Sequence, residues 1–267
     1  MPKLPPAPVP SALKAPPARP GEGNGKVGPS EAAKEAGITV VDWVDERTSL
    51  TGGARWLMFR KVPKGTNWFY TLGSATMFAF LSQAVTGVFL AMYYRPDPSG
   101  GAYESIRYVT NDVFLGQFVR GMHKWGSSVM VILVFLHMGR TFFFGAYKYP
   151  RELNWVIGVV LLILTMVMSF TGYLLPFDQR AYWATIVGVN INGTGPLIGP
   201  YLSDFLRGGS EFGATTLSRF YAIHMLLLPG AIAALMGAHL YLVAKLGTTA
   251  PPWIKAEKPS ELRREQV

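Results

Sequence analysis

Four apolar segments, each long enough to cross a lipid bilayer, restrict most strongly how this chain can fold. They lie around residues 69–94, 125–145, 155–176 and 220–246, and about 20 helical residues span roughly 30 Å of hydrocarbon. Hydrophobic residues make up 49% of the 267 residues and charged residues only 15%, which also favours membrane residence. We therefore expect an all-α membrane protein in which residues 67–250 form a four-transmembrane-helix bundle.

The segments on either side of the bundle differ from it in composition. Residues 1–38 are rich in Pro, Ala and Gly and have too few apolar residues to offset the entropy of ordering, so we expect a flexible tail. Residues 251–267 form a polar C-terminal tail. Between 39 and 66, apolar residues such as Val40 and Val44 recur at helical spacing, which predicts an amphipathic helix on the membrane surface. A helix packed against a partner protein explains this pattern equally well.

The basic residues predict the orientation of the bundle. The net charge is +9, yet Lys and Arg follow the predicted topology rather than forming a stripe with interleaved aromatic residues, so we expect no nucleic-acid binding. With a cytoplasmic N-terminus, eighteen of the 25 Lys and Arg residues fall on the cytoplasmic side. This asymmetry predicts that both termini are cytoplasmic. No apolar core of a signal peptide is expected at the start of the chain.

Prolines and glycines predict where the membrane helices end. The first helix is expected from about Trp68 to Tyr94, before the Pro-rich turn that begins at Arg95. A loop containing Gly100 and Gly101 follows. The second helix is expected over about 120–144 and the third over about 154–175. The long segment 177–216 that comes next is expected to form short helices on the outer face.

The chain has four histidines, and all of them fall in the second and fourth membrane segments. His123 and His137 are 14 residues apart, and His224 and His239 are 15 apart. At 100° per residue, either spacing returns to nearly the same face of a helix about four turns further on. Because the second and fourth helices run in the same direction, His123 is expected beside His224 and His137 beside His239, at two depths.

The chemistry of these pairs favours haem iron. Ionisable side chains inside a membrane are costly and usually mark function, although a single histidine is as often a hydrogen-bonded core residue. Zinc and copper sites need more ligands than one histidine pair, whereas a haem iron takes two axial ligands. We expect His123 and His224 to bind the outer haem iron and His137 and His239 the inner one. Because the chain has no cysteine, both groups are expected to be non-covalent haem b.

Glycines and basic residues support the same interpretation. Gly73 and Gly87 in the first helix, and Gly158 and Gly172 in the third, are each 14 residues apart. Glycine costs about 1 kcal/mol in a helix relative to alanine but lets a flat macrocycle approach the backbone; small residues also serve helix–helix contacts. The haem propionates are expected to pair with Arg120, Lys124 and Arg140. Snorkelling towards the membrane surface explains these three positions equally well.

Seven short stretches of the sequence resemble the cytochrome b family, in particular its cytochrome b6 type, which corresponds to the N-terminal half of a longer cytochrome b. The resemblance covers about 41–250, and a spacing of 15 in the fourth helix is typical of the b6 type. The stretches are Trp43-Val-Asp-Glu-Arg47, Gln83-Ala-Val-Thr-Gly87, Tyr93-Tyr-Arg-Pro96, Arg120-Gly-Met-His-Lys-Trp125, Pro150-Arg-Glu-Leu-Asn-Trp155, Thr171-Gly-Tyr-Leu-Leu-Pro-Phe-Asp-Gln179 with Tyr182-Trp183, and Thr216-Leu-Ser-Arg-Phe-Tyr-Ala-Ile-His224.

This resemblance implies a subunit of a quinol:cytochrome c oxidoreductase, or of one with a plastocyanin-like acceptor, in a bacterial inner membrane. Such a complex oxidises quinol at the outer side and sends one electron to a Rieske iron–sulfur protein. The other electron passes through the outer and inner haems to quinone, and protons are translocated. The implied partners are a subunit IV-like chain, the Rieske protein, a c-type cytochrome and membrane lipid, in a dimeric complex. Tyr173, Pro176, Tyr182 and Ala184 are implied to line the outer quinol pocket.

Three positions depart from the b6 pattern. Thr71 stands where b6 carries the cysteine that tethers an additional haem, so no covalent haem is expected. Ala244, next to Lys245, stands where an inner-site arginine is expected, and Trp56 stands where an aspartate is expected. The sequence therefore leaves the function of the inner quinone site open.

The main alternative is a dihaem b-type membrane anchor of another respiratory dehydrogenase or reductase. Such an anchor would not require the Pro-Arg-Glu-Leu or Leu-Pro-Phe-Asp-Gln stretches. A transmembrane ferric or oxygen reductase would be accompanied by a Gly-rich dinucleotide-binding loop. A transporter would show discontinuous helices with polar groups at the membrane midplane. The sequence shows neither of these last two features.

Overall fold

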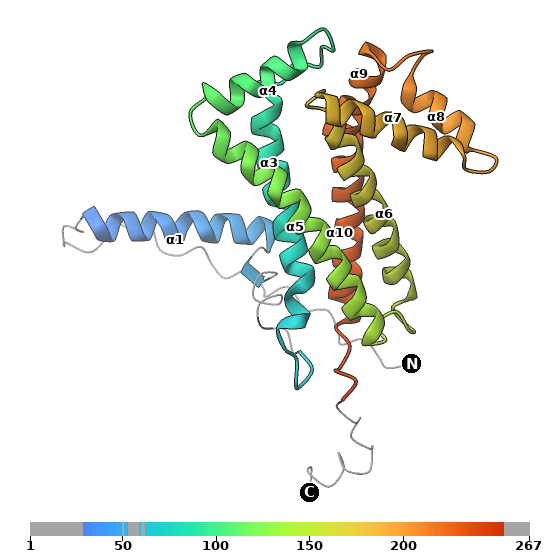
Figure 1. Cartoon of the computed structure of the whole chain (residues 1–267). Helices are drawn as coiled ribbons and strands as arrows, with labels where there is room; N and C mark the ends of the chain where they lie inside the picture. The colour runs from blue at the N-terminus through green and yellow to red at the C-terminus, as the bar shows by residue number, and fades with distance from the viewer. Residues whose placement is uncertain (1–28, 50, 53–58, 60–61, 254–267) are drawn as a thin grey trace, which may run out of the picture. The chain divides into compact units, whose positions relative to one another are not determined.

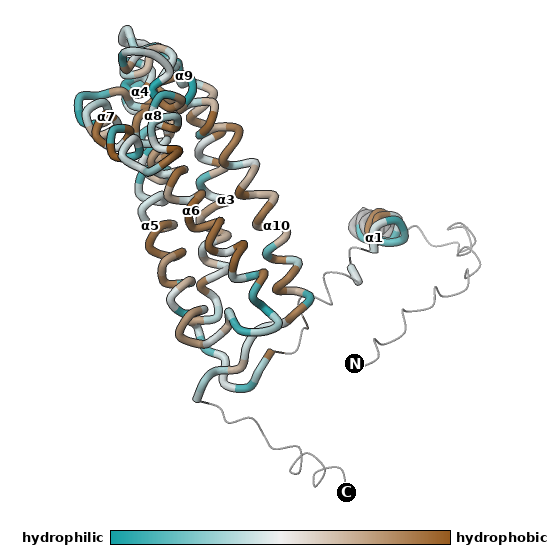
Figure 2. Tube along the Cα trace, turned by 90° about the vertical axis from the view of Figure 1, so that its right-hand side faces the viewer, coloured by the Kyte–Doolittle hydropathy of each residue, from teal (hydrophilic) through white to brown (hydrophobic). Residues whose placement is uncertain are grey.

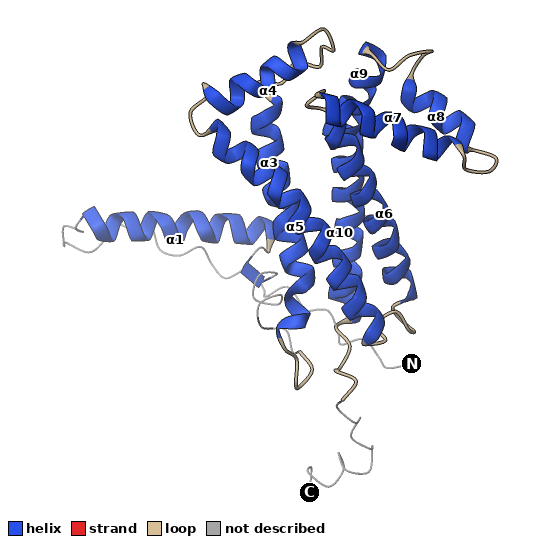
Figure 3. Ribbon diagram, viewed as in Figure 1, coloured by secondary structure: helices blue, strands red, loops and turns tan. Residues whose placement is uncertain are grey.

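The structure is a computed structural model that describes residues 29–49, 51–52, 59 and 62–253. The chain divides into two compact units, Met1–Arg60 and Lys61–Val267, which are described separately below. Within the described residues all regular secondary structure is helical and no strand occurs (Figure 3). The expectation of an all-α protein is confirmed.

Four helices of the second unit are long and apolar enough to cross a membrane. They cover Trp68–Ala91, Gly116–Phe143, Glu152–Leu174 and Ala214–Leu246, which confirms the predicted count. In chain order the elements are η1 (Trp68–Thr71), α3 (Leu72–Ala91), α4 (Gly101–Asn111), α5 (Gly116–Phe143), α6 (Glu152–Leu174), α7 (Gln179–Gly193), α8 (Gly199–Arg207), α9 (Ala214–Ala222), η2 (Ile223–Leu227) and α10 (Leu228–Leu246). The last membrane helix is thus made of α9, η2 and α10.

The long helices run side by side as a bundle (Figures 1 and 2). Helix α3 packs mainly against α5, and α6 packs mainly against α10. Only 6% to 11% of the most apolar stretch of each helix is buried inside the chain. Helices that are apolar all round and yet exposed are typical of membrane spans, where lipid covers them. The chain is therefore a multi-pass membrane protein.

A small apolar core joins three of these helices halfway along the bundle. It consists of Ala79 and Phe80 of α3, Met130 of α5 and Ile232 of α10. Met130 lies midway in sequence between the two histidines of α5, and Ile232 lies midway between those of α10. The core therefore fills the space between the two histidine depths.

Short helices cover one end of the bundle, which we call the outer end (Figure 1). Helices α7 and α8 form in the segment where short helices were expected. Helix α4 was not predicted, because residues around Gly100 and Gly101 were interpreted as a loop. Its buried residues Ala102, Ser105 and Val109 recur at helical spacing, but only packing against neighbouring elements makes that face apolar in effect. The outer core comprises Ala102, Leu174, Val189, Leu206, Leu217 and Phe220.

The connection from α6 to α7 explains much of the Leu-Pro-Phe-Asp-Gln stretch. Phe177 adopts a left-handed backbone conformation with φ of 49°, which reverses the chain after Pro176. The Asp178 side chain then accepts a hydrogen bond from the Ala181 amide at 2.8 Å and caps α7. Tyr94 donates to the Leu175 carbonyl at 2.6 Å, and burial raises the pKa of Tyr94, so the hydroxyl stays a neutral donor. The turn is thus fixed to the end of α3.

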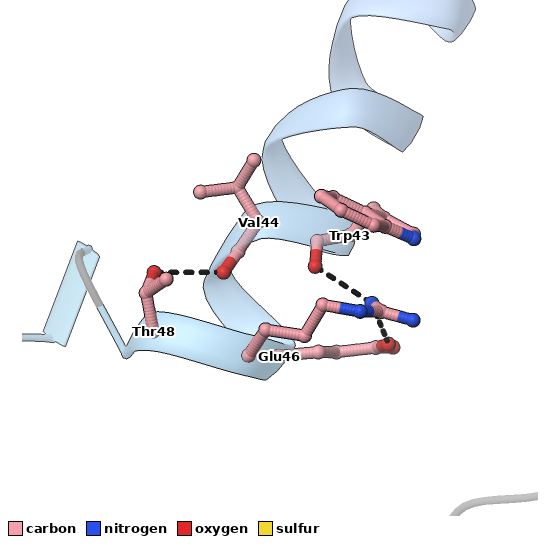
Figure 4. A network of polar contacts seen from close by, with 5 residues as sticks. Trp43, Val44, Glu46 and Thr48 are labelled. Carbon is pink, nitrogen blue, oxygen red and sulfur yellow. Dashed lines mark hydrogen bonds and ion pairs between the residues drawn. The ribbon is translucent and has the colours of Figure 1, made fainter.

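The first unit contains helix α1, Pro29–Thr48. It begins inside the range 1–38 predicted as a tail; residues 1–28 and Trp56 lie outside the described residues. Near its end, Arg47 donates to the Trp43 carbonyl at 2.8 Å and Thr48 donates to the Val44 carbonyl at 2.7 Å (Figure 4). Both bonds satisfy carbonyl groups near the helix end. Trp43 is exposed, which agrees with either a membrane surface or a partner protein.

Candidate functional site

The four histidines form two pairs between α5 and α10. His123 and His224, here called the outer level, have ring centroids 6.4 Å apart and ring planes at 76°. His137 and His239, the inner level, show the same distance and the same angle. An imidazole nitrogen lies about 2 Å from a bound metal, so two imidazoles on one ion have centroids roughly 6 Å apart. Each pair therefore has room for one metal ion between its rings.

The donor set at both levels fits haem better than a bare ion. Among the described residues, no group of three or more histidine or acidic side chains is placed to hold a metal ion. Two imidazoles leave the remaining coordination positions of an ion to another ligand. The four nitrogens of a porphyrin supply these positions. The pairs thus suit the axial positions of an iron porphyrin.

A π-helical turn makes the two levels equal despite the unequal spacing of the histidines. The turn η2 contains His224, and the Leu228 amide donates to the Ile223 carbonyl, five residues back. Such a turn absorbs one additional residue and occurs frequently at functional sites. Pro229 follows directly and lacks the N–H that would bond to Met225 in an α-helix. The turn was not predicted; Pro229 soon after a histidine was its only signal.

Each of the four predicted glycines faces one histidine ring. We compare them by the distance from a Cβ atom placed on the glycine to Cε1 of the ring. These distances are 3.0 Å for Gly73 and His137, 3.3 Å for Gly87 and His123, 3.5 Å for Gly158 and His239, and 2.5 Å for Gly172 and His224. Close contacts of this kind leave little room for a side chain. The glycines thus make space for the imidazoles themselves, whereas the sequence analysis assigned that space to the macrocycle.

Two threonines that the sequence analysis missed contact the outer histidines. Thr86 Oγ1 lies 2.9 Å from His123 Nδ1, and Thr171 Oγ1 lies 3.2 Å from His224 Nδ1. The His224 Nδ1 also lies 3.0 Å from the Met168 carbonyl. A signal was present in the sequence, because each threonine directly precedes the outer-level glycine of its helix.

The basic residues differ in how well they could bind a propionate. Arg140 lies with its guanidinium 3.8 Å from the centroid of the Tyr70 ring, and its buried Nε and Nη2 have no hydrogen-bond partner among the described residues. Buried donors without a partner are costly, so Arg140 fits a carboxylate ligand near the inner level. Arg120 Nη1 donates to Thr110 Oγ1 at 3.3 Å. Lys124 is exposed, which agrees with snorkelling.

The residues expected at an outer quinol pocket are only partly brought together. A cavity of about 270 Å³ at the outer end is lined by Pro98, Phe177, Asp178, Gln179, Tyr182 and Trp183. Of the four expected residues, only Tyr182 lines it, with its ring centroid 5.8 Å from that of Phe177. Tyr173 and Ala184 are exposed, and Pro176 is partly buried outside this lining. Phe177 was missed because it is one apolar residue within an apolar stretch.

The positions that depart from the b6 pattern lie near the inner level. Thr71 donates to the Trp68 carbonyl at 2.7 Å. Ala244 is partly buried, and the adjacent Lys245 has its Nζ 5.9 Å from the Tyr241 ring centroid. The Tyr70 hydroxyl donates to the Thr249 carbonyl at 2.9 Å. No other basic side chain is thereby brought to the place of the expected arginine by these contacts.

The fold and the site define a class: helical multi-pass membrane proteins with paired histidines at two levels of a four-helix bundle. The chain belongs to the cytochrome b family, because the family described as Cytochrome b/b6/petB matches residues 57–247.

Individual relatives agree with this membership. The chain is 45% identical over 218 residues to the menaquinol:cytochrome c reductase cytochrome b subunit of Geobacillus thermodenitrificans, covering 79% of this chain and 97% of that protein. It is 43% identical over 213 residues to cytochrome b6 of Heliobacterium modesticaldum, covering 79% and 100%. It also resembles a solved chain of a hyperthermophilic respiratory Complex III, with a TM-score of 0.73 and 31% identity over 82% of this chain. It spans only 59% of that longer chain.

Proposed function

We propose that this chain is the dihaem cytochrome b subunit of a quinol:cytochrome c-type oxidoreductase. The observation that carries the proposal is the equal geometry of two histidine pairs, with ring centroids 6.4 Å apart at both levels. A structural role for the histidines would not require two matched pairs. The names of two relatives, menaquinol:cytochrome c reductase and cytochrome b6, support an electron-transfer role and favour a menaquinol-type substrate.

Two non-covalent haem b groups would be held by the four histidines. His123 and His224 would bind the outer group, and His137 and His239 the inner one. Gly73, Gly87, Gly158 and Gly172 keep the space around the four rings free of side chains. Arg140, with buried unpaired donors, would bind an inner propionate, and Arg120 and Lys124 would serve the outer group. Haem iron, when bound, accepts and donates single electrons.

Quinol oxidation would take place at the outer end of the bundle. The cavity next to Tyr182 and Phe177 supports a quinol pocket there, and Tyr173, Pro176 and Ala184 would complete it together with a partner chain. One electron would leave to a Rieske iron–sulfur protein and a c-type cytochrome. The other would pass from the outer to the inner level and reach quinone, with coupled proton translocation.

The proposal also includes the setting of the chain in its complex. A subunit IV-like chain would supply the remaining half of cytochrome b, since the solved relative is longer than this chain. We place the protein in a bacterial inner membrane with both termini in the cytoplasm, in a dimeric complex. The excess of basic residues on one side of the predicted topology supports this orientation.

Counting the haems tests the proposal. In the purified complex, a reduced-minus-oxidised spectrum with redox titration should show two low-spin b haems per chain with separate midpoint potentials. His224→Ala should remove only the outer haem and His239→Ala only the inner one, because each variant leaves the other pair intact. Retention of both haems in either variant, or one haem in the unmodified chain, would contradict the assignment.

A further inference from the structure

The outer histidines have hydroxyl partners that the inner histidines lack. Thr86, one residue before Gly87, contacts His123, and Thr171, one residue before Gly172, contacts His224. Both threonines are buried, with exposed fractions of 6% and 1%. The same contact is therefore built twice, once on α3 and once on α6.

The helix backbone determines which way these hydroxyl groups donate. Thr86 Oγ1 lies 2.7 Å from the Ser82 carbonyl and 3.2 Å from the Gln83 carbonyl. Thr171 Oγ1 lies 3.0 Å from the Val167 carbonyl and 3.1 Å from the Met168 carbonyl. A hydroxyl group has one proton and two lone pairs. With its proton held by a carbonyl, each hydroxyl can only accept from the histidine.

This arrangement selects one tautomer of each outer histidine. Nδ1 must carry the proton that the threonine accepts, so Nε2 keeps its lone pair for iron. An acceptor on the Nδ1–H also raises the basicity of a ligating imidazole. A more basic ligand favours ferric over ferrous iron and so lowers the reduction potential.

The inner level lacks this feature at the matching positions. The residues that precede Gly73 and Gly158 are Leu72 and Ile157, which have no hydroxyl group. The buried Nδ1 of His239 faces the Asn154 backbone without reaching hydrogen-bond geometry. The chain thus makes the two histidine pairs equal in position but different in their hydrogen-bond partners.

We propose that Thr86 and Thr171 accept the Nδ1–H protons of His123 and His224 and thereby hold the outer haem at a lower reduction potential than the inner haem. This inference rests on the proposed function, because it needs a haem at each level. The threonines are positioning residues that act through the histidines. An electron from quinol at the outer end then moves downhill in energy towards the inner level.

Redox titration of hydroxyl-deleting variants in the assembled complex tests the inference. Thr86→Val and Thr171→Val should raise the potential of the outer haem and leave that of the inner haem unchanged, so that the gap between the two narrows. Thr86→Ser and Thr171→Ser keep the hydroxyl group and should restore the parent potential. Thr165→Val is the matched control, since Thr165 is buried on α6 and donates to the Leu161 carbonyl without a histidine contact.

Hydroxyl groups added at the inner level provide the converse test. Leu72→Thr and Ile157→Thr place a hydroxyl directly before Gly73 and Gly158, and should lower the potential of the inner haem. If the valine variants do not assemble, this pair decides: a lowered inner potential supports the inference, and an unchanged one overturns it.

Other outcomes separate this inference from the proposed function. Two haems with an outer potential unchanged in both valine variants would overturn the inference alone. An equal shift of both haems, or the same shift in Thr165→Val, would also overturn it. Fewer than two haems in the unmodified chain would instead overturn the proposed function.

Discussion

Gly172 lies closer to the imidazole of His224 than Gly158 lies to that of His239. The distance from a Cβ atom to Cε1 would be 2.5 Å at Gly172 and 3.5 Å at Gly158. The first is shorter than any ordinary contact, whereas the second is a normal van der Waals contact. The same substitution on one helix should therefore have opposite consequences at the two levels.

Gly172→Ala should displace His224 and lower the occupancy of the outer haem, at a cost of about 1–3 kcal/mol of overpacking. Gly158→Ala should leave both haems in place and stabilise α6 by up to about 1 kcal/mol, because alanine is the better helix former. Haem per polypeptide and thermal unfolding of the complex measure both effects. Equal haem loss in the two variants would contradict the difference in contact.

The π-turn predicts that α10 tolerates a deletion that α5 does not. Removal of Leu226, an exposed residue of η2, together with Pro229→Ala should give a plain α-helix with His224 and His239 14 residues apart. Both haems should remain. Removal of Val129 from α5, which has no π-turn, should rotate His123 by about 100° relative to His137 and cause loss of a haem.

Haem content of the two deletion variants decides this prediction. Loss of the outer haem from the shortened α10, with both haems kept in the shortened α5, would show that η2 does not compensate for the additional residue.

Arg140 and Lys124 should differ in their effect on haem. Arg140→Gln removes a buried cation near the inner level, so the inner haem should bind more weakly and its reduction potential should fall, with a loss of about 1.5–3 kcal/mol for a charged hydrogen bond. Lys124→Gln changes an exposed side chain and should leave both haems nearly unchanged. Haem retention in detergent and redox titration measure this; equal effects would refute a propionate contact at Arg140.

No haem should remain attached to this chain after denaturation. The chain contains no cysteine, and Thr71 stands where the b6 type carries the tethering residue, so thioether attachment is excluded. Denaturing electrophoresis with haem staining should give no signal for this chain, while a c-type subunit in the same sample serves as the positive control. A stained band at its mass would contradict this expectation.

The short helices at the outer end show how far sequence patterns extend. Helices α7 and α8 were expected from a long segment between two membrane helices, whereas α4 was missed. Val109 of α4 and Val189 of α7 belong to the same buried core, yet neither stands out in a window of sequence. A short helix with few apolar residues is stabilised by what it packs against, so its own sequence carries a weak signal.

The sequence by itself determined the four membrane helices and the faces on which the histidines lie. Both follow from the fixed rise and rotation of a helix and from the need to bury apolar residues in lipid. Only the tertiary structure decided that η2 makes the two pairs equal, that Gly172 lies against His224, and that Thr171 accepts its proton. These contacts join residues far apart in the chain, and they depend on backbone hydrogen bonding and helix packing that local periodicity does not specify.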